Sequence, residues 1–330
     1  TFERRFGREV VRLQKTYRLR PRGVALVITC ASYPAWNAYP AVMANLATGN
    51  PVIVKPHPGG TLPMAITVLC GRQVLEEAGF DPNLLTLAPD TADAPMTKAL
   101  ALHPAAAIVD FTGSAEFGAW LEDKCRQALV YTETSGCNAV IVESTENLQG
   151  LLDALAQGIC LFSSQMCTSP QNIFVPQTGI ETDEGVLTAE AFADRLVASI
   201  DAVVDDPAHA AATCGAPQSD RVSETIARAG SDLEVLRESR AYDHPDYPGA
   251  RTATPLVLRE EQPHQAARRE WFGPIAFVLP VADRAAALEL AAKDIKELGS
   301  IAAYLYTTDP AYLAEVETQF SRAGASFGCN

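Results

Sequence analysis

The chain contains no run of apolar residues long enough to cross a membrane, because a spanning helix needs about 20 consecutive apolar residues. Basic residues are also scarce: 26 Lys and Arg stand against 40 Asp and Glu, for a formal net charge of −14. Nucleic acid binding requires clustered positive charge, so we expect neither a nucleic acid nor a membrane as a partner. The opening stretch TFERRFGREVVRLQK lacks the apolar core of a secretion signal.

Patterns that bind metals or form disulfide frameworks are missing as well. Eight cysteines occur without a CxxC pair, and five histidines occur without an HExxH motif. Cysteines scattered through apolar segments of a chain this long are typical of reduced thiols. We therefore predict a cytoplasmic protein without a metal site.

What the chain does have is apolar residues in alternating patterns. Hydrophobic residues make up 48% of the 330 positions, enough for two domains with ordinary cores. In the first part, short apolar runs alternate with stretches of helical spacing, with strands expected at 24–28, 51–55, 84–88, 106–110 and 128–132 and helices near 37–48 and 61–78. Such alternation predicts a doubly wound α/β sheet with parallel strands and helices on both faces.

The pattern starts again after Asn138. Strands are expected at 138–143, 172–175, 254–258, 275–279 and 300–308, with helices at 148–162, 190–203, 283–293 and 309–320. The stretch 179–190 is predicted to be a loop. We therefore expect two domains, residues 1–136 and 137–330, each of α/β class.

The segment FTGSAEFG (111–118) places glycines around the start of a predicted helix. A strand runs into Gly113, the helix opens at Ser114, and Gly118 allows close packing. Free N–H groups at a helix N-terminus attract phosphate. The GxGxxG dinucleotide fingerprint is absent, and an ordinary strand-to-helix turn would look the same.

Three further side chains are candidates for chemistry. Lys55 ends a predicted strand, where α/β sheets bind ligands, although a solvated lysine fits equally well. Cys167 lies in a polar loop between a helix and a strand, where a thiolate nucleophile can be reached. The alternative, a buried and inert thiol, fits Cys70, Cys125, Cys160 and Cys214 better than it fits Cys167. Glu133 at a strand end is a candidate general base, or else a surface carboxylate.

Taken together, FTGSAEFG, YTETSGCN (131–138), FSSQMC (162–167) and REWFGP (269–274) resemble the ordered motifs of the aldehyde dehydrogenase superfamily. The resemblance covers the chain from about residue 17 to its end. It implies a Rossmann-like cofactor domain and a second α/β catalytic domain. The wording of ITCASYPAWNAYP (28–40) is most similar to the subgroup tied to bacterial phenylacetate degradation.

The resemblance also implies a role for each matching residue. Cys167 corresponds to the nucleophile and Glu133 to the general base. Lys55 corresponds to the lysine at the adenine-side ribose, and Gly113, Ser114 and Gly118 to the pyrophosphate turn. Glu270 corresponds to the carboxylate at the nicotinamide ribose, and Phe272 to the aromatic residue beside that ring. The implied cofactor is NADP or NAD, and the implied substrate is a small-molecule aldehyde.

Two positions depart from the family pattern. Counting back from Lys55 places Ser32 where the family has the asparagine that stabilises the developing oxyanion, with Asn37 one helical turn on as a weaker substitute. Losing such a donor costs roughly 2.7–4 kcal/mol in the transition state. Pro58 stands where many NAD-preferring members carry a glutamate, and its lack of charge admits NADP.

Three functions follow from these residues. The first is oxidation of an aldehyde to a carboxylic acid through a cysteine thioester, with a phenylacetate-pathway semialdehyde as one substrate. The second passes the thioester to coenzyme A, although Glu133 favours water. The third is a catalytically weak structural or assembly protein. The resemblance further implies that an N-terminal part and a C-terminal end are missing, and that the full-length form is a homo-oligomer.

Overall fold

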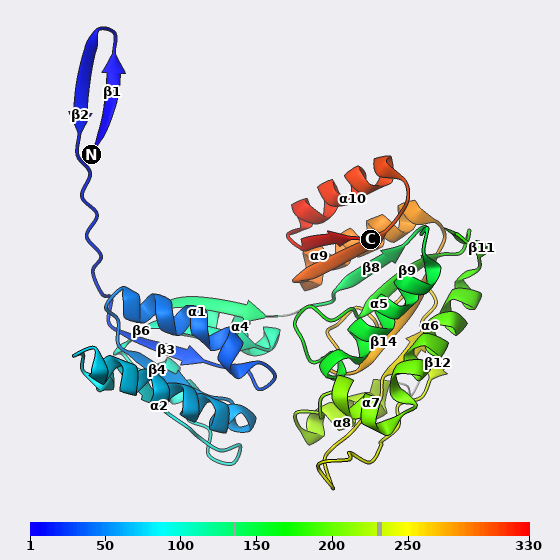
Figure 1. Cartoon of the computed structure of the whole chain (residues 1–330), viewed down its shortest axis with the longest axis horizontal. Helices are drawn as coiled ribbons and strands as arrows, with labels where there is room; N and C mark the ends of the chain where they lie inside the picture. Colours follow the sequence, from blue (N-terminus) through cyan, green and yellow to red (C-terminus); the bar gives the residue numbers. More distant parts are fainter. Residues whose placement is uncertain (135, 230–232) are drawn as a thin grey trace. The chain divides into compact units, whose positions relative to one another are not determined.

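The computed structural model describes residues 1–134, 136–229 and 233–330. Residue 135, which belongs to the YTETSGCN motif, lies outside these ranges, as do residues 230–232. The described chain folds into two compact units, Thr1–Glu133 and Thr134–Asn330 (Figure 1). The domain boundary expected between residues 136 and 137 lies three residues beyond this division.

The first unit contains a five-stranded sheet in the order β5–β4–β3–β6–β7. Its strands are β3 (Val24–Ile28), β4 (Val52–Lys55), β5 (Leu85–Leu87), β6 (Ala106–Gly113) and β7 (Leu129–Thr134). The pairs β3–β4, β3–β6 and β4–β5 are parallel, with Ile28 opposite both Lys55 and Phe111. The carboxyl ends of these strands therefore share one edge of the sheet.

Helices cover both faces of this sheet. Helices α1 (Pro34–Ala47) and α2 (Thr61–Glu77) pack on Ala25, Val27 and Val54. The opposite face, with Leu26, Val109 and Phe111, is covered by α3 (Thr97–Ala101) and α4 (Ala115–Lys124). Two 3₁₀ turns, Pro58–Gly60 and Pro82–Leu84, precede α2 and β5. Because both faces are buried, the strands read as nearly continuous apolar runs.

The chain begins with an antiparallel hairpin of β1 (Phe2–Phe6) and β2 (Glu9–Leu13). This hairpin forms a two-stranded sheet of its own, and nine of its ten strand residues are exposed. Sequence reasoning did not predict it, because exposed strands lack the alternation of buried and polar positions that marks a half-buried strand.

The second unit is built on a seven-stranded sheet in the order β12–β13–β14–β9–β8–β15–β16. Its strands are β8 (Ala139–Val142), β9 (Asn172–Pro176), β12 (Glu234–Arg237), β13 (Leu256–Arg259), β14 (Ile275–Val281), β15 (Ala302–Tyr306) and β16 (Ser326–Cys329). Only the edge pair β12–β13 is antiparallel among these strands, as the structure describes them. This sheet and the first confirm the predicted α/β class.

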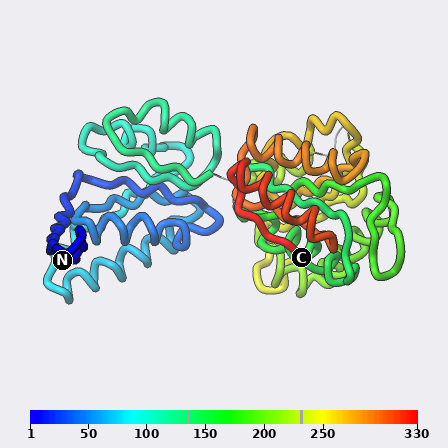
Figure 2. The backbone as a smooth tube through the Cα atoms, turned by 90° about the horizontal axis from the view of Figure 1, so that it is seen from above, coloured from blue at the N-terminus to red at the C-terminus, as the bar shows by residue number. Residues whose placement is uncertain are grey.

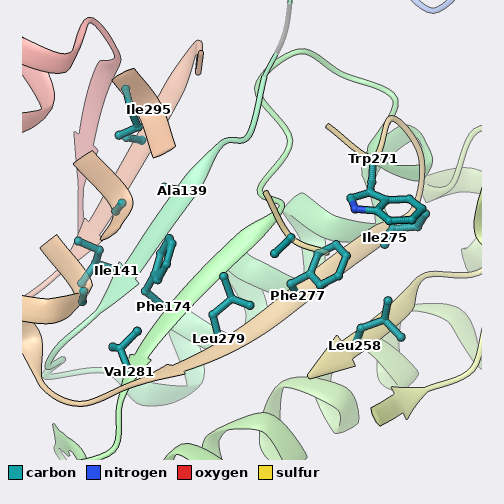
Figure 3. Packing of buried hydrophobic residues seen from close by; sticks show 14 of the residues in the cluster. Ala139, Ile141, Phe174, Leu258, Trp271, Ile275, Phe277, Leu279, Val281 and Ile295 are labelled. Atoms are coloured by element: carbon teal, nitrogen blue, oxygen red, sulfur yellow. The ribbon is translucent and has the colours of Figure 1, made fainter. Parts of the chain in front are cut away.

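Two clusters of apolar side chains flank this sheet. On one face lie α5 (Leu148–Cys160), α6 (Ala189–Val204) and α7 (Pro207–Thr213). On the other lie α8 (Asp220–Ala229), α9 (Arg284–Leu298) and α10 (Pro310–Ala323). Figure 3 shows Phe174, Phe277 and Trp271 packed in the second cluster. Figure 2 shows the backbone of the chain as a tube seen from above, coloured along the sequence.

The structure corrects the sequence prediction in three places. The expected loop 179–190 holds a hairpin of β10 (Ile180–Thr182) and β11 (Gly185–Leu187), whose three-residue strands are too short to show periodicity. Between the expected helix 190–203 and the expected strand 254–258, where no element was predicted, the structure has α7, α8 and β12. Cys70, expected to be buried, is exposed, because α2 buries Met64 and Val68 on its other face.

Burial has a clear effect on the pKa of one carboxylate in the first unit. Asp110 lies on β6 opposite Val27 of β3 and is half-buried. Burial, followed by the negative charge of Glu133, raises the pKa of Asp110 to about 6. Its ionised form is therefore disfavoured in the folded protein.

We expect Asp110→Asn to stabilise the protein at neutral pH. Because the folded-state pKa is raised, wild type loses stability as pH rises from about 4 to about 6. The variant does not titrate there, so its advantage should grow over this range and then stay level. Allowing for screening of the charge by solvent, we expect the free energy of unfolding of the variant to exceed that of wild type by on the order of 1 kcal/mol at pH 7.5.

Urea unfolding at pH 4 and pH 7.5, followed by tryptophan fluorescence, measures this difference. Asp93→Asn is the control, because Asp93 is exposed. An Asp110→Asn effect that is equal at both pH values would contradict the prediction.

Candidate active site

Cys167 lies in the turn between α5 and β9 of the second unit, and it is half-buried. The chain reaches this turn through three residues with left-handed backbones: Phe162, Ser163 and Ser164, with φ of 50°, 53° and 49°. Such angles cost free energy in residues with side chains, and they persist only where the surroundings impose them. The cysteine is therefore presented by a strained segment.

Side-chain hydrogen bonds hold this strained segment in place. The Ser164 hydroxyl donates to the carbonyl of Ile159 over 2.7 Å, and the Ser163 hydroxyl donates to the carbonyl of Gly215. The amide of Gln165 donates to the carbonyl of Ala216 over 3.0 Å and accepts from the N–H of Gln218 over 2.8 Å. The segment after α7 thus supports the approach to Cys167.

Asn138 holds the other side of the cysteine turn. Its amide nitrogen donates to the carbonyls of Cys167 and Ser169 over 2.7 and 2.9 Å. Its amide oxygen accepts from the Ser300 hydroxyl over 3.0 Å and the Ala302 N–H over 3.1 Å. One buried side chain therefore connects the start of β8, the turn and the start of β15. Sequence reasoning included Asn138 in a motif but gave it no role.

Glu270 and Phe272 flank the buried Trp271 in the segment before β14. The backbone N–H of Trp271 donates to the side-chain oxygen of Gln171 over 2.7 Å. The side-chain amide nitrogen of Gln171 donates to the carbonyl of Arg269 over 3.0 Å. Gln171 lies four residues after Cys167 in sequence. It therefore links the cysteine turn to the segment that carries the two predicted cofactor residues.

A small pocket lies where these segments meet. Its lining includes Glu270, Phe272, Gln171, Met166 and Ser169. The lining residues do not include Cys167 itself, although both of its flanking segments contribute. The Ser169 hydroxyl is buried and lacks a hydrogen-bond partner among the described residues. A polar ligand in the pocket would supply one.

The remaining thiols have other surroundings. Burial raises the pKa of Cys125, and it raises the pKa of Cys137 to about 12. Hydrogen bonding with Cys214, followed by burial, raises the pKa of Cys160. Cys70 and Cys329 are exposed. Burial and then the charge of Cys167 raise the pKa of Tyr304 on β15, a neighbour of the cysteine that the sequence did not suggest.

The predicted base and the two candidate oxyanion donors belong to the first unit. Glu133 is exposed near the end of β7, and the Asn37 amide nitrogen donates to its carboxylate over 3.1 Å. The Cys30 thiol faces the Asn37 amide oxygen at 3.6 Å, and the Ser32 hydroxyl faces the same thiol at 3.8 Å. Asn37 therefore contacts Glu133 directly, a pairing that sequence spacing did not predict.

The turn between β6 and α4 contains the residues that the sequence assigned to pyrophosphate binding. The Ser114 hydroxyl caps α4 by accepting from the N–H of Phe117 over 3.4 Å. A Cβ at Gly113 would lie 2.5 Å from the ring of Phe111, so a side chain at this position would force that ring to move. Gly118 is buried in the first turns of α4, where its N–H donates to the carbonyl of Ser114 over 3.0 Å.

Lys55 is the last residue of β4, and its ammonium lies 2.6 Å from the Asp90 carboxylate. It also donates to the carbonyl of Pro56 over 2.6 Å. Burial raises the pKa of Asp90, but hydrogen bonds from Lys55 and the N–H of Met96 more than offset it, so the pKa lies below its ordinary value. Sequence reasoning selected Lys55 but missed Asp90, which lies 35 residues further along.

Within the described ranges, no group of three or more His, Cys, Asp or Glu side chains is arranged to hold a metal ion. Every helix in the same ranges is too short or too polar to span a bilayer.

Comparison with known proteins identifies the family. Residues 5–327 match the sequence model of the aldehyde dehydrogenase family. Betaine aldehyde dehydrogenase 2 from Rhizobium meliloti is 30% identical over 81% of this chain, and vanillin dehydrogenase from Pseudomonas fluorescens is 28% identical over 82%. These matches cover 53% and 55% of the two relatives, so the chain spans about half of their length.

A solved structure agrees over a longer stretch. The NAD-dependent aldehyde dehydrogenase from Burkholderia multivorans is 40% identical, with a TM-score of 0.92 over all of this chain and 60% of that protein. An NADP-dependent glyceraldehyde-3-phosphate dehydrogenase from Bacillus halodurans, 21% identical, has a TM-score of 0.73 and shares the fold. The two largely parallel α/β sheets, the order of the motifs and these matches together show that the chain belongs to the aldehyde dehydrogenase family.

Proposed function

We propose that the protein oxidises a small-molecule aldehyde to a carboxylic acid, using NAD or NADP, through a thioester on Cys167. The observation that supports this most is the placement of Cys167 on a strained turn whose neighbours line the pocket with Glu270 and Phe272. A half-buried thiol in a polar turn suits a nucleophile. The chain spans about half of its relatives, so the activity of the whole protein is part of this proposal.

The chemistry divides between the residues of the chain. The Cys167 sulfur attacks the aldehyde carbon, and a donor stabilises the oxygen that becomes negatively charged. The hydride that leaves this carbon would pass to a bound nicotinamide cofactor, which supplies the oxidant. The product on Cys167 is a thioester. Glu133 then removes a proton from water, which attacks the thioester, releases the acid and returns the thiol.

The resemblance to the family assigns cofactor contacts within each unit taken by itself. In the first unit, the N-terminus of α4, which the chain enters through Gly113 and Ser114, would attract the pyrophosphate, and Gly118 allows close packing behind it. Lys55 lies at the strand end assigned to the adenine-side ribose. In the second unit, Glu270 would hold the nicotinamide ribose and Phe272 would contact the ring. We accordingly propose that the first unit is the cofactor domain and the second the catalytic domain.

Substrate choice is a finer proposal. The sequence ITCASYPAWNAYP (28–40) resembles the phenylacetate-degradation subgroup. The relatives include vanillin dehydrogenase and a benzaldehyde dehydrogenase from Pseudomonas putida, each 28% identical. We propose an aromatic aldehyde or a semialdehyde derived from phenylacetate. A homo-oligomeric full-length form and a cytoplasmic location stay predictions.

Cys167 should be alkylated faster than any other thiol of the chain. Cys70 and Cys329 are more exposed, so exposure alone would favour them. We expect iodoacetamide at pH 7 to modify Cys167 at least about tenfold faster than Cys70, because a nucleophilic thiol reacts through its thiolate. Peptide mapping after timed labelling measures both rates, and labelling in order of exposure would show that Cys167 is not the nucleophile.

Glu133→Gln should slow thioester hydrolysis and leave thioester formation largely intact. Loss of a general base costs on the order of a hundredfold or more, so we expect a normal burst of reduced cofactor followed by slow turnover. Glu122→Gln is the matched control, because Glu122 accepts a hydrogen bond from Thr132 on the neighbouring position of the same strand. Equal loss of burst and turnover would contradict this role for Glu133.

Ser32→Ala and Asn37→Ala should affect different steps. We expect Ser32→Ala to slow thioester formation by about a hundredfold if its hydroxyl is the oxyanion donor. Asn37→Ala should instead slow hydrolysis, because it removes the hydrogen bond to Glu133. Rapid mixing separates the two rates. A slowed burst in Asn37→Ala alone would make Asn37 the donor, and a faster burst in Ser32→Asn would show that an amide serves better there.

A further inference from the structure

Lys55 and Asp90 form a buried ion pair at the carboxyl edge of the first sheet. The side chains of Lys55 and Asp90 are each only 3% exposed, and their charged atoms are 2.6 Å apart. The second carboxylate oxygen of Asp90 accepts from the N–H of Met96 over 2.9 Å. Both groups are therefore fixed in place, and their opposite charges compensate each other.

No other cation is available in the neighbouring loops of the sequence. Residues 29–33, 56–60 and 88–96, which follow β3, β4 and β5, contain no Lys or Arg, but they contain Asp90 and Asp93. Burial, followed by the charge of Lys55, lowers the pKa of His57, so this imidazole is neutral at pH 7. The Lys98 ammonium lies over the Trp120 ring, 4.9 Å from its centroid.

We propose that Asp90 is a specificity-determining residue that makes the protein prefer NAD to NADP. The inference rests on the proposed function, in which Lys55 lies at the adenine-side ribose. A 2′-phosphate would bring about two negative charges to a site whose single lysine is already paired. Ribose hydroxyls are uncharged, so the same site tolerates them.

Asp90 thereby supplies the negative charge that is missing at position 58. Pro58 stands where a glutamate would repel a 2′-phosphate. Considered by itself, Pro58 would therefore allow NADP to bind. The carboxylate of Asp90 comes instead from the loop after β5, which pairs with β4 in parallel. The cofactor preference inferred from Pro58 is therefore reversed by a residue that lies next to Lys55 only in the folded chain.

Calorimetric titration of the protein with NAD and NADP tests the proposal. We expect wild type to bind NAD at least tenfold more tightly, about 1.4 kcal/mol. Asp90→Asn should narrow this ratio at least tenfold, mainly by tightening NADP, because Lys55 is then free to pair with the phosphate. An unchanged ratio in Asp90→Asn, or a wild type that binds NADP as well as NAD, would overturn it.

Two comparisons make the outcome specific. Asp93→Asn, in the same loop but exposed, should leave the ratio unchanged; an equal effect there would overturn the assignment to Asp90. Because Asp90→Asn leaves a buried ammonium unpaired and can impair folding, wild type is also titrated with 5′-AMP and 2′,5′-ADP. We expect 2′,5′-ADP to bind at least tenfold more weakly, and equal or tighter binding would overturn the proposal.

These outcomes also separate the inference from the function on which it rests. Binding of NAD without the expected preference removes the role of Asp90 alone and leaves the proposed dehydrogenase standing. If neither dinucleotide nor 5′-AMP binds, the proposed function and the inference both fail.

Discussion

The side-chain amide of Asn138 is the interaction on which the second unit's site depends. It donates to the carbonyls of Cys167 and Ser169 and accepts from Ser300 and the N–H of Ala302. All four bonds lie at the point where β8, the cysteine turn and β15 meet. A buried amide that lost these partners would be left desolvated without compensating hydrogen bonds, which destabilises the folded state. The same four bonds therefore stabilise the fold and fix the backbone at Cys167.

Each unit contains strain or buried charge next to residues that are assigned a role in the chemistry. Three successive left-handed residues precede Cys167, Asp110 has a raised pKa beside Glu133, and the Lys55–Asp90 pair is buried at a strand end. Each feature costs stability by itself. The large apolar cores on both faces of each sheet offset these costs.

The sequence predicted the long, strongly periodic elements well. Strand 24–28 was placed at its observed bounds, and the helix-opening Ser114 was recognised, because a capping serine after a buried strand is a local signal. The β10–β11 hairpin and the exposure of Cys70 were missed. Short strands carry too few residues to show a period, and the outward face of a helix depends on what the helix packs against.

Residue types and their order in the chain therefore determined the α/β class, the family and the identity of Cys167, Glu133 and Lys55 as candidates. Only the tertiary structure paired Asn37 with Glu133 across 96 residues and Lys55 with Asp90 across 35. Motifs are local because turns, caps and strand ends are local. The charge that a site presents is a sum over side chains brought together from separate strands, and no spacing along the sequence specifies that sum.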